Sequence, residues 1–172
     1  QDESPPATDY PGQSRAKKDF AQLPGKIAWV IGASLFVRRE VFASLNGFDL
    51  DFFLYSEETD LCLRTRKLGH EIGMVAEVTV RHIGAVSERG RDPYEMWTRK
   101  MNGIHLFWKK HYSLEDAARL VRRDLRHARI QIFLAGLLAA FQPPRSLAWQ
   151  KHRRYLAIRD TSATFLALTT RA

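Results

Sequence analysis

Hydrophobic positions in the second half of the chain recur at helical spacing. After Pro93, the apolar residues that repeat every three or four positions are Tyr94, Trp97, Met101, Ile104 and Trp108. This spacing places them on one face of an amphipathic helix. Pro93 suits the first turn of such a helix, because the backbone N–H that it lacks would have no partner there. The pattern therefore predicts a helix that begins at Pro93 and buries one face.

A second, longer helix is predicted from Ser113 to Phe141. Ser113 and Asp116 resemble a capping pair at its start, and Pro143-Pro144 ends it. Its first part is rich in Arg, and its second part is apolar but shorter than the ~20 residues that a membrane span needs. Two interpretations stay open: a helix lying on a membrane surface, or a helix packed against protein. The tail after Arg154 is weakly patterned and predicts no element.

The first half of the chain holds short β-branched runs separated by turn signals. The runs that predict strands are Ile27–Ile31, Leu35–Val37, Glu71–Val75 and Val78–Ile83. A short helix is expected over Arg38–Leu45, and Asn46-Gly47 is a strong turn signal directly after it. Residues 1–26 are punctuated by Pro and Gly and are expected to form a flexible arm.

An acidic segment follows the turn. The carboxylates between Glu40 and Arg64, with no Lys or Arg among them, are those of Asp49, Asp51, Glu57, Glu58 and Asp60. Ser56 is a suitable N-cap, so Glu57 and Glu58 fall in the first turn of a helix that ends near Gly69. Acids beside the apolar block Phe52–Tyr55 have perturbed charge states and are candidates for function. The alternative is an ordinary helix start, because the helix dipole favours acids there.

Composition narrows the class of protein. The 172 residues are enough for one domain. The single cysteine, Cys62, excludes an internal disulfide, and no Cys or His cluster has zinc spacing. Residues 1–92 contain 12 Lys and Arg against 14 Asp and Glu, whereas residues 93–172 contain 15 against 5. The basic excess therefore lies in the C-terminal part, which indicates either a polyanionic partner or a solvated basic helix surface.

Several motifs in order resemble the second half of a family 2 glycosyltransferase, closest to the bacterial rhamnosyltransferase-like group. These motifs are Gly32 to Phe42, Asn46-Gly47-Phe48-Asp49, Phe52 to Arg64, Gly69, and His82-Ile83-Gly84-Ala85-Val86-Ser87. The chain departs from the family pattern at two positions: Asn46 and Ala85 each stand where the family has Gly. Asn tolerates a positive φ nearly as well as Gly does, so the first departure is mild.

The resemblance implies an α/β fold: the C-terminal, acceptor-side half of a GT-A-type fold with a mixed sheet, followed by C-terminal helices. It divides the chain into the flexible arm 1–26, an acceptor and catalytic half over 27–92, and a basic helical extension over 93–172. It implies inverting glycosyl transfer of the hexosyltransferase type, from a nucleotide-diphosphate sugar to a hydroxyl acceptor in cell-surface polysaccharide synthesis. The nucleotide-binding half is expected to precede Gln1, so this fragment alone is expected to be inactive.

The resemblance also implies residue roles. The catalytic base is Glu58, with Glu57 as its partner and Asp60 as the fallback. The acceptor side is lined by Gly32, Ala33, Asp49 and Tyr55. From the residues alone, the small residues at 32–34 fit a tight packing site equally well, and Asp49 fits a turn cap equally well.

The expected cofactor is a divalent cation, Mg or Mn, held partly by His82 and partly by residues outside this chain. A lone His is otherwise more often structural than a ligand. Expected partners are a nucleotide-sugar donor, a saccharide or lipid-linked acceptor, an anionic membrane surface, and a second copy paired through an exposed sheet edge. The expected location is the cytoplasm, peripheral on the inner face of the plasma membrane.

The alternative function is non-enzymatic: a basic helical module that binds anionic membrane or nucleic acid. The Arg-rich helix lacks the interleaved aromatic residues that stack on bases, which argues against specific binding of single-stranded nucleic acid.

Overall fold

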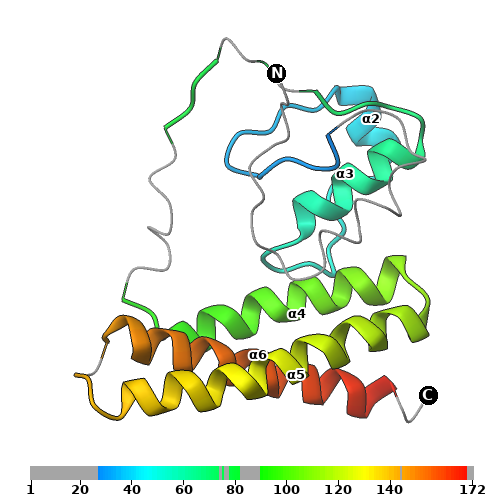
Figure 1. The fold of residues 1–172 in the computed structure, drawn as a ribbon. Helices are drawn as coiled ribbons and strands as arrows, with labels where there is room; N and C mark the ends of the chain where they lie inside the picture. Colours follow the sequence, from blue (N-terminus) through cyan, green and yellow to red (C-terminus); the bar gives the residue numbers. More distant parts are fainter. Residues whose placement is uncertain (1–26, 74, 76–77, 82–89, 144, 170–172) are drawn as a thin grey trace. The chain divides into compact units, whose positions relative to one another are not determined.

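The structure, a computed structural model, describes residues 27–73, 75, 78–81, 90–143 and 145–169. The chain divides into two compact units, residues 1–84 and residues 85–172, and the helices of each are drawn in Figure 1.

The described residues of the first unit contain two helices, α2 (Arg39–Ser44) and α3 (Glu57–Lys67). The predicted turn after α2 is confirmed: Asn46 and Gly47 both have positive φ, of 56° and 73°. The Gly47 amide donates to the Phe42 carbonyl at 2.9 Å. A β-carbon at position 47 would stand only 3.2 Å from the Phe42 ring, so this position requires glycine both for its φ and for the close approach of that ring.

Helix α3 follows the charge pattern that its dipole favours. Its first turn holds Glu57, Glu58 and Asp60, and its last turn holds the basic residues Arg64, Arg66 and Lys67. Gly69, with φ of 87°, lies directly after the C-cap Leu68 and fits the predicted helix end. The buried apolar residues of the unit come from this helix and the loop before it; they are Phe52, Leu61, Cys62 and Leu63.

The expected α/β fold with a mixed sheet is wrong. All regular structure among the described residues is helical, and no strand forms in the described parts of the four runs that predicted strands. A strand must donate and accept ladder hydrogen bonds with a neighbour, whereas a helix satisfies its backbone internally. The β-branched side chains of Val75, Val78 and Val80 are accordingly exposed rather than buried in a sheet. An alternating apolar pattern indicates that a segment favours the strand conformation. It does not indicate that a second segment is available to pair with it.

The second unit is built from three helices: α4 (Pro93–His111), α5 (Leu114–Ala139) and α6 (Leu147–Thr169). Both predicted helix starts are confirmed. The Asp92 side chain accepts from the Tyr94 amide at 2.8 Å at the start of α4. At the start of α5, Ser113 Oγ accepts from the Asp116 amide at 3.1 Å and donates to the Asp116 carboxylate at 2.8 Å.

Helix α6 lies within the helical extension expected over 93–172, but the sequence pattern of the tail gave it no bounds of its own. Ser146 precedes it, and Ser146 Oγ accepts from the Trp149 amide at 3.2 Å. Its large buried residues recur at helical spacing and are Tyr155, Ile158 and Phe165. This spacing, together with the absence of Pro and Gly from 145 to 169, was a readable helix signal.

Polar contacts join α4 to α6. Arg153 donates to both carboxylate oxygens of Asp92, and the Tyr94 hydroxyl donates to Asp160 at 2.9 Å. Further along both helices, the His105 ring lies 5.1 Å from the ring of Phe165. Partners therefore advance together in sequence, so α4 and α6 run parallel while α5 returns between their ends (Figure 1).

Candidate active site

One buried stripe runs along α3. Glu58, Cys62 and Arg66 are four residues apart, so they share one face of the helix, and all three side chains are buried. The segment before α2 lies along this stripe. The Cys62 thiol lies against the backbone of Val30, and Gly32 lies against the β-carbon of Glu58. The structure therefore brings the predicted base and the small-residue segment together.

Glu58, the predicted base, is buried in the first turn of α3. Its side chain is only 8% exposed. Burial raises the pKa of its carboxyl above the ordinary 4.5, a hydrogen bond from its own backbone amide lowers it, and the charge of Glu57 raises it again. A carboxylate with a raised pKa is a stronger acceptor of protons than an exposed one. The burial that sequence reasoning expected for this acid is present.

Glu57 contributes an unsatisfied acceptor beside the base. Its Oε2 atom is buried and has no hydrogen-bond donor among the described residues. A buried oxygen without a donor costs free energy in the unbound protein. Such an atom is suited to accept a hydrogen bond from a substrate hydroxyl.

Asp60, the fallback base, is engaged in a structural network. It is 1% exposed, and Arg64 Nε donates to its Oδ2 at 2.7 Å. The other two nitrogens of Arg64 donate to the carbonyls of Leu45 and Gly47, at 3.0 Å each. Asp60 thus holds the guanidinium that fastens α3 to the turn after α2.

The backbone immediately before the acids is left-handed at two successive residues. Tyr55 has φ of 71° and Ser56 has φ of 72°, a conformation that costs side-chain-bearing residues free energy. Ser56 is the N-cap residue, as predicted, but it makes no side-chain cap hydrogen bond. Its role is therefore to turn the chain sharply, which aims the first turn of α3.

The remaining predicted acceptor residues lie in loops outside the helices. Ala33 is exposed beside Gly32, and Tyr55 is half-buried at the turn. The Asp49 carboxylate accepts from the Asp51 amide at 3.0 Å, so it closes a local turn of the loop before α3.

The predicted metal ligand His82 lies outside the described residues. No group of three or more His, Cys, Asp or Glu side chains suited to a metal ion occurs among the residues whose placement is described. The described residues therefore do not by themselves assemble a metal site.

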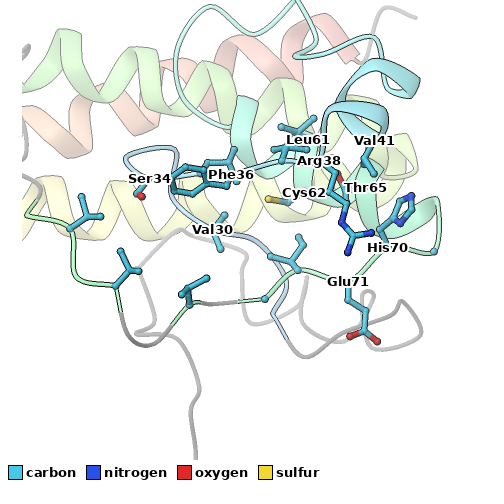
Figure 2. Close-up of a pocket in the computed structure, with 18 residues that line it drawn as sticks. Val30, Ser34, Phe36, Arg38, Val41, Leu61, Cys62, Thr65, His70 and Glu71 are labelled. Carbon is cyan, nitrogen blue, oxygen red and sulfur yellow. The ribbon is translucent and has the colours of Figure 1, made fainter.

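A cavity of about 670 Å³ lies beside the buried stripe. Figure 2 shows Leu61 and Cys62 on its helix side, Phe36 toward one end, and Arg38 and His70 toward the other. Cys62 belongs to both the stripe and the cavity wall, whereas Glu58, one turn earlier, does not line the cavity. Sequence reasoning missed this cavity, because its lining comes from segments up to 50 residues apart.

Comparison with known proteins identifies the family. Residues 15–170 match the family described as Glycosyl transferase family group 2. The chain belongs to this family, which confirms the expectation of a family 2 glycosyltransferase. No solved structure gives a significant match.

The curated relatives are rhamnosyltransferases. N-acetylglucosaminyl-diphospho-decaprenol L-rhamnosyltransferase of Mycobacterium tuberculosis strain H37Rv is 33% identical over 87 residues, which cover 51% of this chain and 28% of the relative. Rhamnosyltransferase WbbL of Escherichia coli K12 is 42% identical over 43 residues, covering 25% of this chain and 16% of the relative. The chain thus spans less than a third of the length of each, and the rhamnosyltransferase-like character is confirmed.

Proposed function

We propose that the protein takes part in inverting transfer of a rhamnosyl or related hexosyl unit from a nucleoside-diphosphate sugar to a hydroxyl of a lipid-linked saccharide. Family membership supports the reaction type. The names of the relatives, one of which acts on a diphospho-decaprenol, support the donor sugar and the acceptor class. The observation that carries the proposal is Glu58, a buried carboxyl with a raised pKa at the start of α3.

The proposed reaction transfers one proton to the protein and exchanges one bond at the anomeric carbon of the donor sugar. The acceptor hydroxyl loses its proton to the Glu58 carboxylate while its oxygen forms a bond to the anomeric carbon of the donor. The bond from that carbon to the diphosphate breaks, and the electron pair leaves with the diphosphate. A positioned base is worth about 10²- to 10⁴-fold in rate.

The contacts favour Glu58 over Asp60 as the base. The carboxylate of Asp60 is already bound by the Arg64 guanidinium, which also fastens α3 to the turn after α2. Glu58 has a backbone amide but no cationic partner among the causes of its shift. Glu57 Oε2, buried without a donor, is proposed to accept a hydrogen bond from the acceptor saccharide.

The test is the Glu58→Gln variant of the intact protein, assayed for transfer to a lipid-linked acceptor and for donor binding by calorimetry. The proposal predicts that turnover falls by about 10²-fold or more while donor affinity is unchanged. The matched control is Glu40→Gln, which changes an exposed carboxylate on α2. Near-normal turnover in Glu58→Gln would exclude this base.

Two parts of the sequence-based expectation stay predictions. Metal dependence, with His82 as a ligand, is tested by whether activity lost on chelation returns with Mg or Mn. The location at the inner face of the plasma membrane is tested by fractionation of cells. The non-enzymatic alternative, binding of anionic membrane or nucleic acid, would be favoured by binding without any transferase activity of the intact protein.

A further inference from the structure

The C-terminal half of α5 carries an exposed apolar stripe. Its members repeat at helical spacing and are Ile130, Phe133, Leu134, Leu137 and Leu138, followed by Phe141 in the turn after the helix. Each is between 48% and 84% exposed. Leu147, at the start of α6, adds a further exposed side chain at the same end of the α5–α6 hairpin (Figure 1). We call these seven residues the hairpin stripe.

Packing inside the unit does not explain the hairpin stripe. The face of α5 that meets α6 uses small residues: Ala128 and Ala135 are buried, and a β-carbon at Gly136 would stand 3.4 Å from Nε2 of His152 on α6. The large side chains point away from this contact. Contiguous exposed apolar patches of this kind mark interaction sites.

The surroundings of the hairpin stripe are basic. Residues 125–159 contain seven Lys and Arg residues and no Asp or Glu. Arg126 and Arg129, one turn before the stripe, are exposed and form no ion pair with the residues that the structure describes. Lys151 on α6 is exposed as well. Two of the seven, Arg153 and Arg159, are paired with Asp92 and Asp160 inside the unit. The charge left for a partner outside the unit is therefore that of Arg126, Arg129 and Lys151.

We propose that the hairpin stripe seats the α5–α6 hairpin on an anionic lipid bilayer, with the apolar side chains at the boundary of headgroups and acyl chains. Large apolar residues beside a basic surface are the combination that such an interface binds, and each Lys or Arg near it adds to the attraction of anionic lipid. Within the described ranges, no helix has the length and hydropathy needed to cross a bilayer, so α5 lies along the surface.

The composition of the surface argues against two other partners, a second copy of this chain and a nucleic acid. A second copy paired through the same stripe would place two basic, acid-free surfaces against each other, which like-charge repulsion opposes. A nucleic acid would neutralise the Arg residues but would leave the seven large aliphatic and aromatic side chains of the hairpin stripe against phosphate. An anionic bilayer satisfies both the apolar and the charged part of the surface.

The experiment is co-sedimentation of the intact protein with vesicles of phosphatidylcholine alone and of phosphatidylcholine with phosphatidylglycerol, without donor or acceptor. Binding to the anionic vesicles that weakens with salt is expected. Leu137→Ser is expected to bind about tenfold more weakly, and Arg126→Gln with Arg129→Gln to lose most of the preference for phosphatidylglycerol. The matched control is Leu168→Ser, a similarly exposed leucine near the far end of α6, which should bind as the parent does.

Each result decides the proposal. Circular dichroism checks that the variants keep their helices, which exposed substitutions rarely disturb. Equal loss in Leu137→Ser and Leu168→Ser, or equal binding to both vesicle types, overturns it. Absence of vesicle binding together with a dimer that Leu137→Ser dissociates also overturns it and assigns the stripe to self-association. Because no substrate is present, the outcome is independent of the proposed transfer reaction.

Discussion

Gly32 lies directly against Glu58: a β-carbon at position 32 would stand 3.7 Å from the β-carbon of Glu58. This is ordinary van der Waals contact, and Gly32 shows no left-handed φ. Gly32→Ala is therefore expected to fold and to change the free energy of unfolding by less than about 1 kcal/mol. Gly32→Val adds two branched methyl groups beside the base and is expected to lower kcat/KM by about tenfold more than Gly32→Ala.

Both Gly32 variants are measured by chemical denaturation and by transferase assay of the intact protein. Equal activity in the alanine and valine variants would show that this contact does not shape the acceptor side.

The raised pKa of Glu58 sets the pH dependence of the rate. A general base acts when ionised, and burial raises its pKa above the ordinary 4.5. The acidic limb of kcat/KM is therefore expected at higher pH than an exposed glutamate would give. A pH–rate profile whose acidic limb lies at or below 4.5, or one that is unchanged in Glu58→Gln, would contradict the assignment.

The same group makes a prediction about stability. Because the folded-state pKa of Glu58 is raised, its stabilising contribution is present at low pH and is lost as the pH rises through that pKa. At pH 7 the buried charge destabilises the fold. Glu58→Gln is thus expected to have a higher Tm than the parent at pH 7, with the difference shrinking toward acid. Calorimetry of both proteins over this range measures it; a lower Tm at pH 7 would contradict it.

The Asp60–Arg64 pair is expected to be structural. Asp60→Asn removes the charged partner of a guanidinium that also binds two backbone carbonyls, and we expect it to cost about 3 kcal/mol of unfolding free energy. Arg64→Lys should cost a similar amount, because an ammonium cannot reproduce the fork. The double variant should cost less than the sum of the two.

The control for this pair is Arg119→Lys, whose partner Asp116 is exposed; such surface pairs contribute at most about 1 kcal/mol. If Asp60→Asn unfolds like the parent protein yet loses turnover, Asp60 acts in the reaction and not in the fold.

Ser56 stores backbone strain that glycine would release. Its φ is 72° and its side chain makes no cap hydrogen bond, so Ser56→Gly is expected to raise the free energy of unfolding by about 1 kcal/mol. Ser56→Ala keeps the strain and serves as the comparison, expected to be no more stable than the parent. Urea denaturation separates the two; equal stability of both variants would show that the left-handed turn is unstrained.

His105 should make the helical unit sensitive to acid. It is 4% exposed, and burial lowers its pKa from 6.5 to about 4. Because the pKa of His105 is lower in the folded protein than in the unfolded chain, its full contribution to the free energy of unfolding is present above the ordinary pKa. About 3 kcal/mol of that free energy is lost as the pH falls toward 4. His105→Phe, which fits between the rings of Trp108 and Phe165, should abolish this loss.

The difference between parent and variant is the measured quantity, because Asp124 in the same unit titrates with the opposite sign: burial raises its pKa. Thermal unfolding is followed by far-ultraviolet circular dichroism at several pH values. His70→Gln, at an exposed position, is the control. A His105→Phe variant with the parent's acid sensitivity would contradict the prediction.

Local sequence signals were sufficient to predict most of the helices. Pro93, Ser113 and Gly69 mark helix ends through chemistry confined to one turn, and the structure confirms each. The expected sheet failed because ladder hydrogen bonds need a second chain segment, and the alternation of Val78 and Val80 carries no information about that segment.

The part of the candidate site that depends on local signals could also be predicted from the sequence. Glu57 and Glu58 directly follow the predicted N-cap Ser56, so their place in the first turn of α3 was predictable. The contact of Gly32 with Glu58 spans 26 residues, and only the resemblance to glycosyltransferases linked these segments beforehand. The i, i+4 spacing of Asp60 and Arg64 was visible, but the reach of Arg64 to the carbonyls of Leu45 and Gly47 was not.

That reach of Arg64 has a consequence for how this protein can change over generations. One guanidinium binds the chain at the Asn46-Gly47 turn to the last turn of the helix that carries Glu58. A substitution in the turn is therefore expected to shift the helix that carries the Glu58 carboxyl, although it contacts neither that residue nor any substrate. If Glu58 is the proposed base, residues of the turn can alter its position during evolution while the acid itself is kept.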